Sequence, residues 1–176
     1  MHTPLLPLLL SLILLSLPLG WIPQAAAEEA KPKPCTAPAY RQFDFWQGEW
    51  TSYTEDGEEQ GSNHIHAIMN GCGLQENWSG RGGQYQGTSY NFYDRVSGNW
   101  HQTWVDNQGG HLFLSGKFDG TSMQLSGRQA SPKGEVINRI TWTPLEDGRV
   151  RQHWETSSDD GATWSTVFNG FYQRKR

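Results

Sequence analysis

The chain has 176 residues, with 14 Lys and Arg against 18 Asp and Glu, and its formal net charge is −4. The only cluster of positive charge is the terminal Arg174-Lys175-Arg176. Nucleic acid is therefore not expected as a partner, because phosphate backbones are bound by clustered Lys and Arg. The length allows one domain with a substantial core and is too short for two.

Residues 1–27 have the layout of a secretory signal peptide. A head without Lys or Arg precedes an apolar run over 5–19, and three alanines form a small-residue cleavage pattern at the end. The alternative is a membrane anchor, but the apolar run is interrupted by two prolines and is shorter than the roughly 20 residues that span a bilayer. We predict a mature chain that begins at Glu28, is exported to the periplasm or the extracellular space, and is not inserted in a membrane.

Proline and glycine divide the rest of the chain. Seven of the nine prolines precede Tyr40, whereas 19 of the 20 glycines fall between Gly48 and Gly170. Proline removes an N–H donor that a β-ladder needs, and glycine is typical of tight turns. We therefore expect an irregular N-terminal tail over 28–39 and a glycine-punctuated domain over 40–176.

The chain has two cysteines, Cys35 in the tail and Cys72 between two glycines. In an exported chain they are expected to form a disulfide that ties the tail to the domain. The alternative is two free thiols. Neither cysteine has the C-x-x-C spacing of a redox site.

The domain is predicted to consist of strands. Runs rich in Val, Ile, Thr, Tyr, Phe and Trp, separated by Gly, Asn and Asp turns, recur throughout it. They lie near 49–54, 62–69, 73–79, 85–93, 99–105, 111–118, 122–128, 135–143, 150–157 and 164–174. Only 40–46 is a candidate for a short helical turn.

Short turns join antiparallel neighbours, so the topology is predicted to be a meander. About ten strands would leave two open edges unless the sheet closes on itself. The predicted fold is an all-β, up-and-down antiparallel barrel with a short N-terminal helical turn.

One turn carries a motif of its own. Residues 157–164, SSDDGATW, match the Asp-box pattern S-x-D-x-G-x-T-W. Sialidases repeat this motif in propeller blades, far from their catalytic residues. A single copy predicts a rigid hairpin and not glycosidase activity.

The domain opens with FDFWQGEW over 43–50, and Gly48-Glu49-Trp50 within it resembles the G-x-W signature of the calycins, the lipocalin-like superfamily. In calycins the Trp lies across the closed end of the barrel, and a basic residue from near the last strand packs over it. The resemblance implies that Trp50 closes the barrel. It also implies that Arg174 or Lys175 forms a cation–π contact with Trp50, worth about 0.5–2 kcal/mol.

The longer opening F-D-F-W-x-G-x-W, with NFYD, WHQTWVDN, NRITWTPL and FYQRK, resembles a group of uncharacterised exported bacterial proteins over nearly all of the mature chain. The nitrobindins are a more distant resemblance. They are ten-stranded calycin-like barrels with a His-ligated haem, and their proximal His lies late in the chain. Here the last histidine is His153. We expect no cofactor, with haem through His153 as the alternative.

Other polar residues are candidates for chemistry. His64 and His66 share a strand face, similar to the H-x-H pair of cupins, but the Glu that cupins place three or four residues later is missing. A metal site is therefore not expected. Glu155 is expected to face solvent or to pair with Arg139 or Arg151.

The most informative pattern is the repeated association of Trp with amides. Residues i and i+2 of a strand share a face. Indoles and polar groups share faces in four segments: Glu76 with Trp78; Trp100 with Gln102 and Trp104; Asn138 with Ile140 and Trp142; and Gln152 with Trp154. The opposite pleat would bury Arg151, His153 and Glu155 on one strand, which is costly without a network. The aromatic–amide face is therefore predicted to be the interior.

We predict an exported protein that binds a small hydrophobic or aromatic ligand in the barrel, with no catalytic residues. The predicted ligand-binding residues are Glu76, Trp78, Trp100, Gln102, Trp104, Asn138, Trp142, Gln152 and Trp154. One alternative is an enzyme that uses Glu76 or a histidine as acid–base in the same cavity, since a buried carboxyl has a raised pKa. Another is a structural or interaction module of the cell envelope with a filled barrel.

Overall fold

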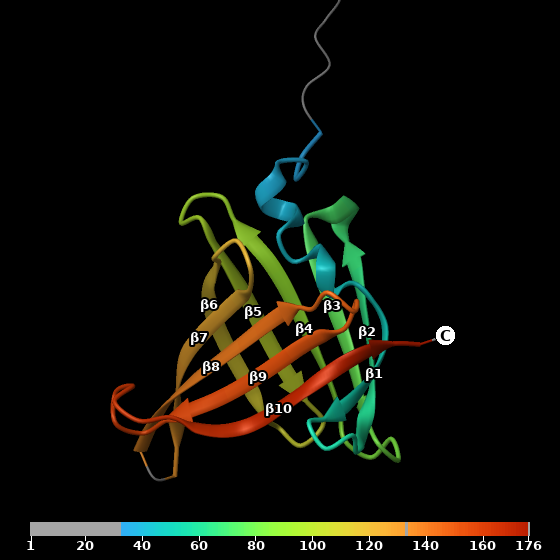
Figure 1. The fold of residues 1–176 in the computed structure, drawn as a ribbon. Coiled ribbons are helices and arrows are strands. Elements are labelled where there is room, and N and C mark those ends of the chain that lie inside the picture. Colours follow the sequence, from blue (N-terminus) through green and yellow to red (C-terminus); the bar gives the residue numbers. More distant parts are fainter. Residues whose placement is uncertain (1–32, 133, 176) are drawn as a thin grey trace, which may run out of the picture. The chain divides into compact units, whose positions relative to one another are not determined.

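The computed structural model describes residues 33–132 and 134–175. The predicted signal peptide and residues 28–32 of the predicted tail lie outside the described residues. Within them, ten antiparallel strands form a closed barrel in which every strand pairs with its neighbours in sequence and β1 pairs with β10 (Figure 1). The predicted up-and-down barrel is confirmed. No helix in this part of the chain is long and apolar enough to cross a membrane.

The strands follow the predicted runs closely. They are β1 (Gly48–Thr54), β2 (Glu59–Ile68), β3 (Gly73–Gly80), β4 (Gln86–Asp94), β5 (Asn99–Asp106), β6 (His111–Phe118), β7 (Met123–Ser131), β8 (Gly134–Pro144), β9 (Val150–Ser157) and β10 (Ser165–Arg174). Three short 3-10 helices accompany them: η1 (Pro38–Arg41), η2 (Asp44–Trp46) and η3 (Met69–Gly71). The predicted helical turn over 40–46 is thus η1 and η2.

One end of the barrel is filled by aromatic rings from the segment that enters it. Phe43, Trp46 and Trp50 are fully buried, and the rings of Phe43 and Trp46 stack with centroids 4.9 Å apart. Trp100 and Trp142 reach this cluster from β5 and β8, with centroids 5.7 and 5.3 Å from the Phe43 ring. We call this end, where η1 and η2 lie, the closed end (Figure 1).

Trp50 stands at the junction that closes the sheet. Its Cα lies opposite Arg174 of β10, and the Arg174 guanidinium carbon is 4.4 Å from the Trp50 ring centroid. The Trp50 indole Nε1 donates a hydrogen bond of 2.9 Å to the Trp46 carbonyl. Gly48 has φ of +142°, and a Cβ there would lie 2.3 Å from the Arg174 guanidinium nitrogen. The glycine of the G-x-W pattern therefore leaves room for the cation.

The predicted disulfide is present between Cys35 and Cys72, with Cα atoms 5.0 Å apart and a sequence separation of 37 residues. It joins the segment before η1 to the turn between β2 and β3. Arg41 of η1 also donates a hydrogen bond to the carbonyl of Gly71. Both contacts attach the entering segment to the closed end.

The Asp-box hairpin between β9 and β10 is held by its own side chains. Asp159 accepts hydrogen bonds from the Ser157 hydroxyl at 2.7 Å and the Thr163 hydroxyl at 2.6 Å. The bond from Thr163 is the main cause that lowers the pKa of Asp159 to about 2. Trp164 donates to the Gly161 carbonyl at 3.0 Å, and the Arg139 guanidinium carbon lies 3.7 Å from a Trp164 ring centroid. The motif builds the predicted hairpin, and hydrogen bonds among its own residues hold the turn.

Replacing Trp50 by Ala is expected to lower the free energy of unfolding by about 3–5 kcal/mol, the usual cost of removing a large buried aromatic side chain. The variant loses the ring on which Arg174 stacks and leaves a void in the closed end. Urea unfolding followed by circular dichroism measures the change.

Asp159→Ala is the control, because it acts on an exposed turn at the opposite end of the barrel and should cost less. A Trp50→Ala variant as stable as the wild type would contradict the closing role of Trp50.

Candidate ligand-binding cavity

The barrel interior is hollow toward the end opposite η1 and η2. A cavity of about 560 Å³ lies there, within the range of about 300–1,000 Å³ that is typical of small-molecule sites. Its mouth is lined by Glu58, Glu59, Arg81 and Tyr85, which lie on or beside the loops that follow β1 and β3. We call this end the open end.

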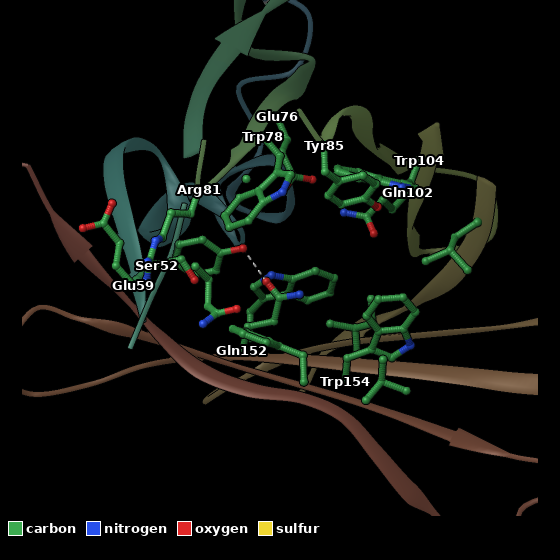
Figure 2. Close-up of a pocket in the computed structure, with 18 of the residues that line it drawn as sticks. Ser52, Glu59, Glu76, Trp78, Arg81, Tyr85, Gln102, Trp104, Gln152 and Trp154 are labelled. Carbon is green, nitrogen blue, oxygen red and sulfur yellow. Dashed lines mark hydrogen bonds between the residues drawn. The ribbon is translucent and has the colours of Figure 1, made fainter. Parts of the chain in front are cut away.

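The walls near the mouth are aromatic. Trp78 of β3, Trp104 of β5, Trp154 of β9 and Phe168 of β10 line the cavity and are half-buried. Figure 2 shows the three indoles on different sides of the cavity. The Trp154 Nε1 donates to Asn138 Oδ1 at 2.9 Å, so the position of this indole is held by a buried amide.

Deeper in the barrel, polar side chains from six strands form one hydrogen-bonded network. We call it the polar network; its members are Asn63, Glu76, Ser89, Asn91, Gln102, Gln152 and Tyr172. Within it, Tyr172 donates to Gln152 Oε1 at 2.6 Å and accepts from Asn63 Nδ2 at 3.3 Å. Figure 2 shows the bond to Gln152 as a dashed line.

The hydrogen bonds of the polar network converge on Glu76. Asn63 Nδ2 donates to Glu76 Oε1 at 2.7 Å, and the Ser89 hydroxyl donates to Glu76 Oε2 at 2.6 Å. The Ser89 oxygen in turn accepts a hydrogen bond from Asn91 Nδ2 at 2.9 Å. Gln102 Nε2 in turn donates to Asn91 Oδ1 at 2.9 Å. Both carboxyl oxygens of Glu76 are therefore acceptors.

Burial dominates the ionisation of this site. Only 6% of Glu76 is exposed, and desolvation raises its pKa from the usual 4.5 to about 7, against the opposing hydrogen bonds from Ser89 and Asn63. Burial and the nearby Glu76 charge also raise the pKa of Tyr172, which therefore stays a neutral donor. Near neutral pH, Glu76 changes its charge while the rest of the polar network does not.

Some buried polar atoms near the cavity have no hydrogen-bond partner among the described residues. They include Ser52 Oγ and Trp142 Nε1, whose residues line the cavity, and Asn63 Oδ1, whose amide donates to Glu76. Unpaired buried polar atoms are uncommon in proteins and often accompany binding sites. The deep part of the cavity thus retains unused hydrogen-bonding capacity.

The structure brings together seven of the nine predicted ligand-binding residues. Those that line the cavity are Glu76, Trp78, Gln102, Trp104, Trp142, Gln152 and Trp154. The other two do not line it. Trp100 points inward but belongs to the closed end, where its Nε1 donates to Gln42 Oε1 at 3.2 Å. Asn138 is buried and holds Trp154.

The histidines lie elsewhere. None of the described histidines lines the cavity. His153 lies between the cavity residues Gln152 and Trp154 and so points to the outer face, where its Nε2 is 3.1 Å from Thr166 Oγ1. His64 and His66 stack on each other at 4.8 Å, and no group of three or more metal-binding side chains occurs among the residues described. Glu155 forms an ion pair with Arg139, one of its two predicted partners, and Arg139 Nη2 lies 3.0 Å from Glu155 Oε2.

Four members of the polar network are not among the predicted ligand-binding residues: Asn63, Ser89, Asn91 and Tyr172. In β4 the aromatic Tyr90 and Phe92 are exposed, at 49% and 44%, while the alternate Ser89 and Asn91 are buried. This reverses the usual pattern of a half-buried strand. A usable signal was the alternation of polar and aromatic residues in SYNF, because Ser89 and Asn91 pair with Trp104 and Gln102 on the predicted inward face of β5.

Comparison with known proteins finds no family model and no curated protein that matches this sequence. The case for a function therefore depends on the cavity itself.

Glu76 should make the stability of the fold depend on pH. The folded pKa lies above the unfolded value, so the folded state binds the proton more tightly, and stability falls as pH rises from 4.5 to about 7. The shift corresponds to about 3 kcal/mol of unfolding free energy. Glu76→Gln is expected to remove this fall, as measured by urea unfolding at a series of pH values.

Glu49→Gln is the matched control, because it removes the same charge from an exposed position on β1. The free energy of unfolding of this variant should fall with rising pH as it does in the wild type. A fall that persists unchanged in Glu76→Gln would show that another group causes it.

Proposed function

We propose that this barrel binds a small hydrophobic or aromatic molecule in its cavity. The observation that carries the proposal is the cavity of about 560 Å³, with three indoles near its mouth and the polar network at its base. Ligand sites in proteins typically combine apolar, aromatic walls with a few converging polar groups. This arrangement supports binding over the alternative of a structural module with a filled interior.

The proposed ligand is flat on at least one part and polar at one end. Indole rings favour stacked or edge-on contact with planar groups. The polar network, which includes Glu76 and Gln102, is buried in the inner part of the cavity. A ligand would therefore bind with its polar end inward. Its apolar body would then remain between the walls.

The compartment and class are part of the same proposal. The Cys35–Cys72 disulfide supports an oxidising compartment, which favours export to the periplasm or the extracellular space. The contact of Arg174 with Trp50 supports placing the barrel among the calycin-like proteins. In this proposal the chain is a carrier or sensor of its ligand and not an enzyme.

A fluorescent apolar probe tests the proposal. N-phenylnaphthylamine is neutral and becomes bright in apolar sites, so titration of the wild type should give saturable fluorescence and energy transfer from Trp. Trp78→Ala is expected to weaken the affinity about tenfold, through lost ring contact.

Trp164→Ala is the matched control, because Trp164 belongs to the Asp-box hairpin and does not line the cavity. It should leave the affinity unchanged. If the folded wild type bound neither this probe nor the naphthyl amine, alcohol and carboxylate used below, the proposed function would be refuted.

A further inference from the structure

The polar network holds a carboxyl group that lacks a positive partner. None of the ion pairs formed by the described residues includes Glu76. Its two partners, Asn63 and Ser89, are neutral. A buried carboxylate without a cation is costly, and the cost is relieved when the group is protonated or when a cation arrives.

The direction of the hydrogen bonds around Glu76 favours a bound cation over protonation of the carboxyl group. Asn63 and Ser89 donate to the two oxygens of Glu76, and the donors of Asn91 and Gln102 are directed along the same chain. This arrangement stabilises the ionised carboxylate, and no member of the polar network accepts a hydrogen bond from Glu76. The unpartnered atom beside it, Asn63 Oδ1, is also an acceptor. Among the unpartnered atoms named above, Trp142 Nε1 is a donor, so the acceptors next to Glu76 are its own carboxyl oxygens and the neighbouring Asn63 Oδ1.

The charged side chains around the cavity are mostly negative. Three of the charged side chains that line it are the carboxylates Glu58, Glu59 and Glu76, and the remaining one, Arg81, is 3.5 Å from Glu58. A cleft with net negative charge attracts cations. Trp78, Trp104 and Trp154 add ring faces that interact favourably with ammonium groups.

We propose that the cavity is selective for organic cations, and that the natural ligand is a protonated amine with an aromatic or apolar body. The ammonium group lies against Glu76, and the body lies between Trp78, Trp104 and Trp154. This inference rests on the proposed function, since it names the class of ligand that the cavity takes.

Binding of such an amine is linked to the proton of Glu76. The ammonium pairs with the carboxylate, so below the Glu76 pKa of about 7 binding expels a proton. Affinity for the amine should therefore rise with pH up to about 7 and then level off. The other titratable groups that face the cavity are Tyr172 in the polar network and Glu58, Glu59, Arg81 and Tyr85 at the mouth.

Three probes of one shape test the charge preference: naphthylmethylamine, naphthylmethanol and naphthoate. At about pH 8, where Glu76 is ionised, the amine should bind about 10- to 100-fold more tightly than the alcohol, as expected for a buried charged contact. Naphthoate should bind most weakly. Calorimetry at about pH 6 in two buffers of different ionisation enthalpy should detect up to about one proton released per amine bound.

Glu76→Gln should reduce the preference for the amine to about twofold or less while retaining the alcohol, and Glu49→Gln should leave both affinities unchanged. The proton release is measured on the wild type, so it decides the case even if Glu76→Gln does not fold.

Equal affinity for amine and alcohol, no proton release, or tighter binding of naphthoate would overturn the cation preference. If N-phenylnaphthylamine still binds in that case, the proposed function stands without the cation preference. If none of the four probes binds, the proposed function itself fails.

Discussion

Closure of the sheet through the pairing of β1 with β10 is the constraint on which the rest of the molecule depends. Without it, both strands would present unpaired edges. Trp50 and Arg174 face each other at this junction, and the segment that supplies Trp50 also supplies Phe43 and Trp46. The strand that closes the barrel circumference is thus continuous with the residues that fill one of its ends.

This continuity decides where the cavity lies. A barrel of about eight strands is just wide enough to be filled by its own side chains, and ten strands enclose more space. The rings of FDFWQGEW fill that space at one end only. Nothing equivalent among the described residues covers the other end, where the loops after β1 and β3 border the mouth. One aromatic segment therefore accounts for both the stability of the closed end and the existence of the cavity.

The interior also differs between its two sides. The polar network comes from β2 to β5 and from β9 and β10, whereas β6, β7 and β8 contribute the buried Leu112, Leu114, Leu125 and Ile140. An antiparallel meander keeps neighbouring strands together, so the polar network occupies one arc of the barrel, and β6, β7 and β8, which contribute none of its members, lie together on the other. A ligand inside would meet hydrogen-bonding groups on one side and hydrocarbon on the other, which restricts its orientation.

Sequence alone predicted the strands well because each is bounded by turn residues, and it predicted the inward face of β5, β8 and β9 because strand alternation is strict. It could not predict depth along the barrel axis. Trp100 and Trp104 share a face, yet only Trp104 lines the cavity. It also gave no inward face for β4, where aromatic residues face outward and small polar residues face inward. Only the pairing of β4 with β3 and β5 shows that Ser89 and Asn91 connect Glu76 to Gln102.

The polar network is difficult to explain as a device for stability. Replacing buried polar groups by well-packed apolar ones is often neutral or stabilising, and a barrel core of Leu, Ile and Val would need no network at all. Here seven polar side chains from six strands are connected, and the donors among them converge on one carboxyl whose pKa is raised to about 7. At the closed end Phe43, Trp46 and Trp50 are fully buried, and burial of large aromatic side chains is the kind of term that can offset the cost of burying Glu76. A fold that concentrates its stability at one end can retain an unfavourable charge midway along its axis, and a cationic ligand is the partner that would turn this charge into binding energy.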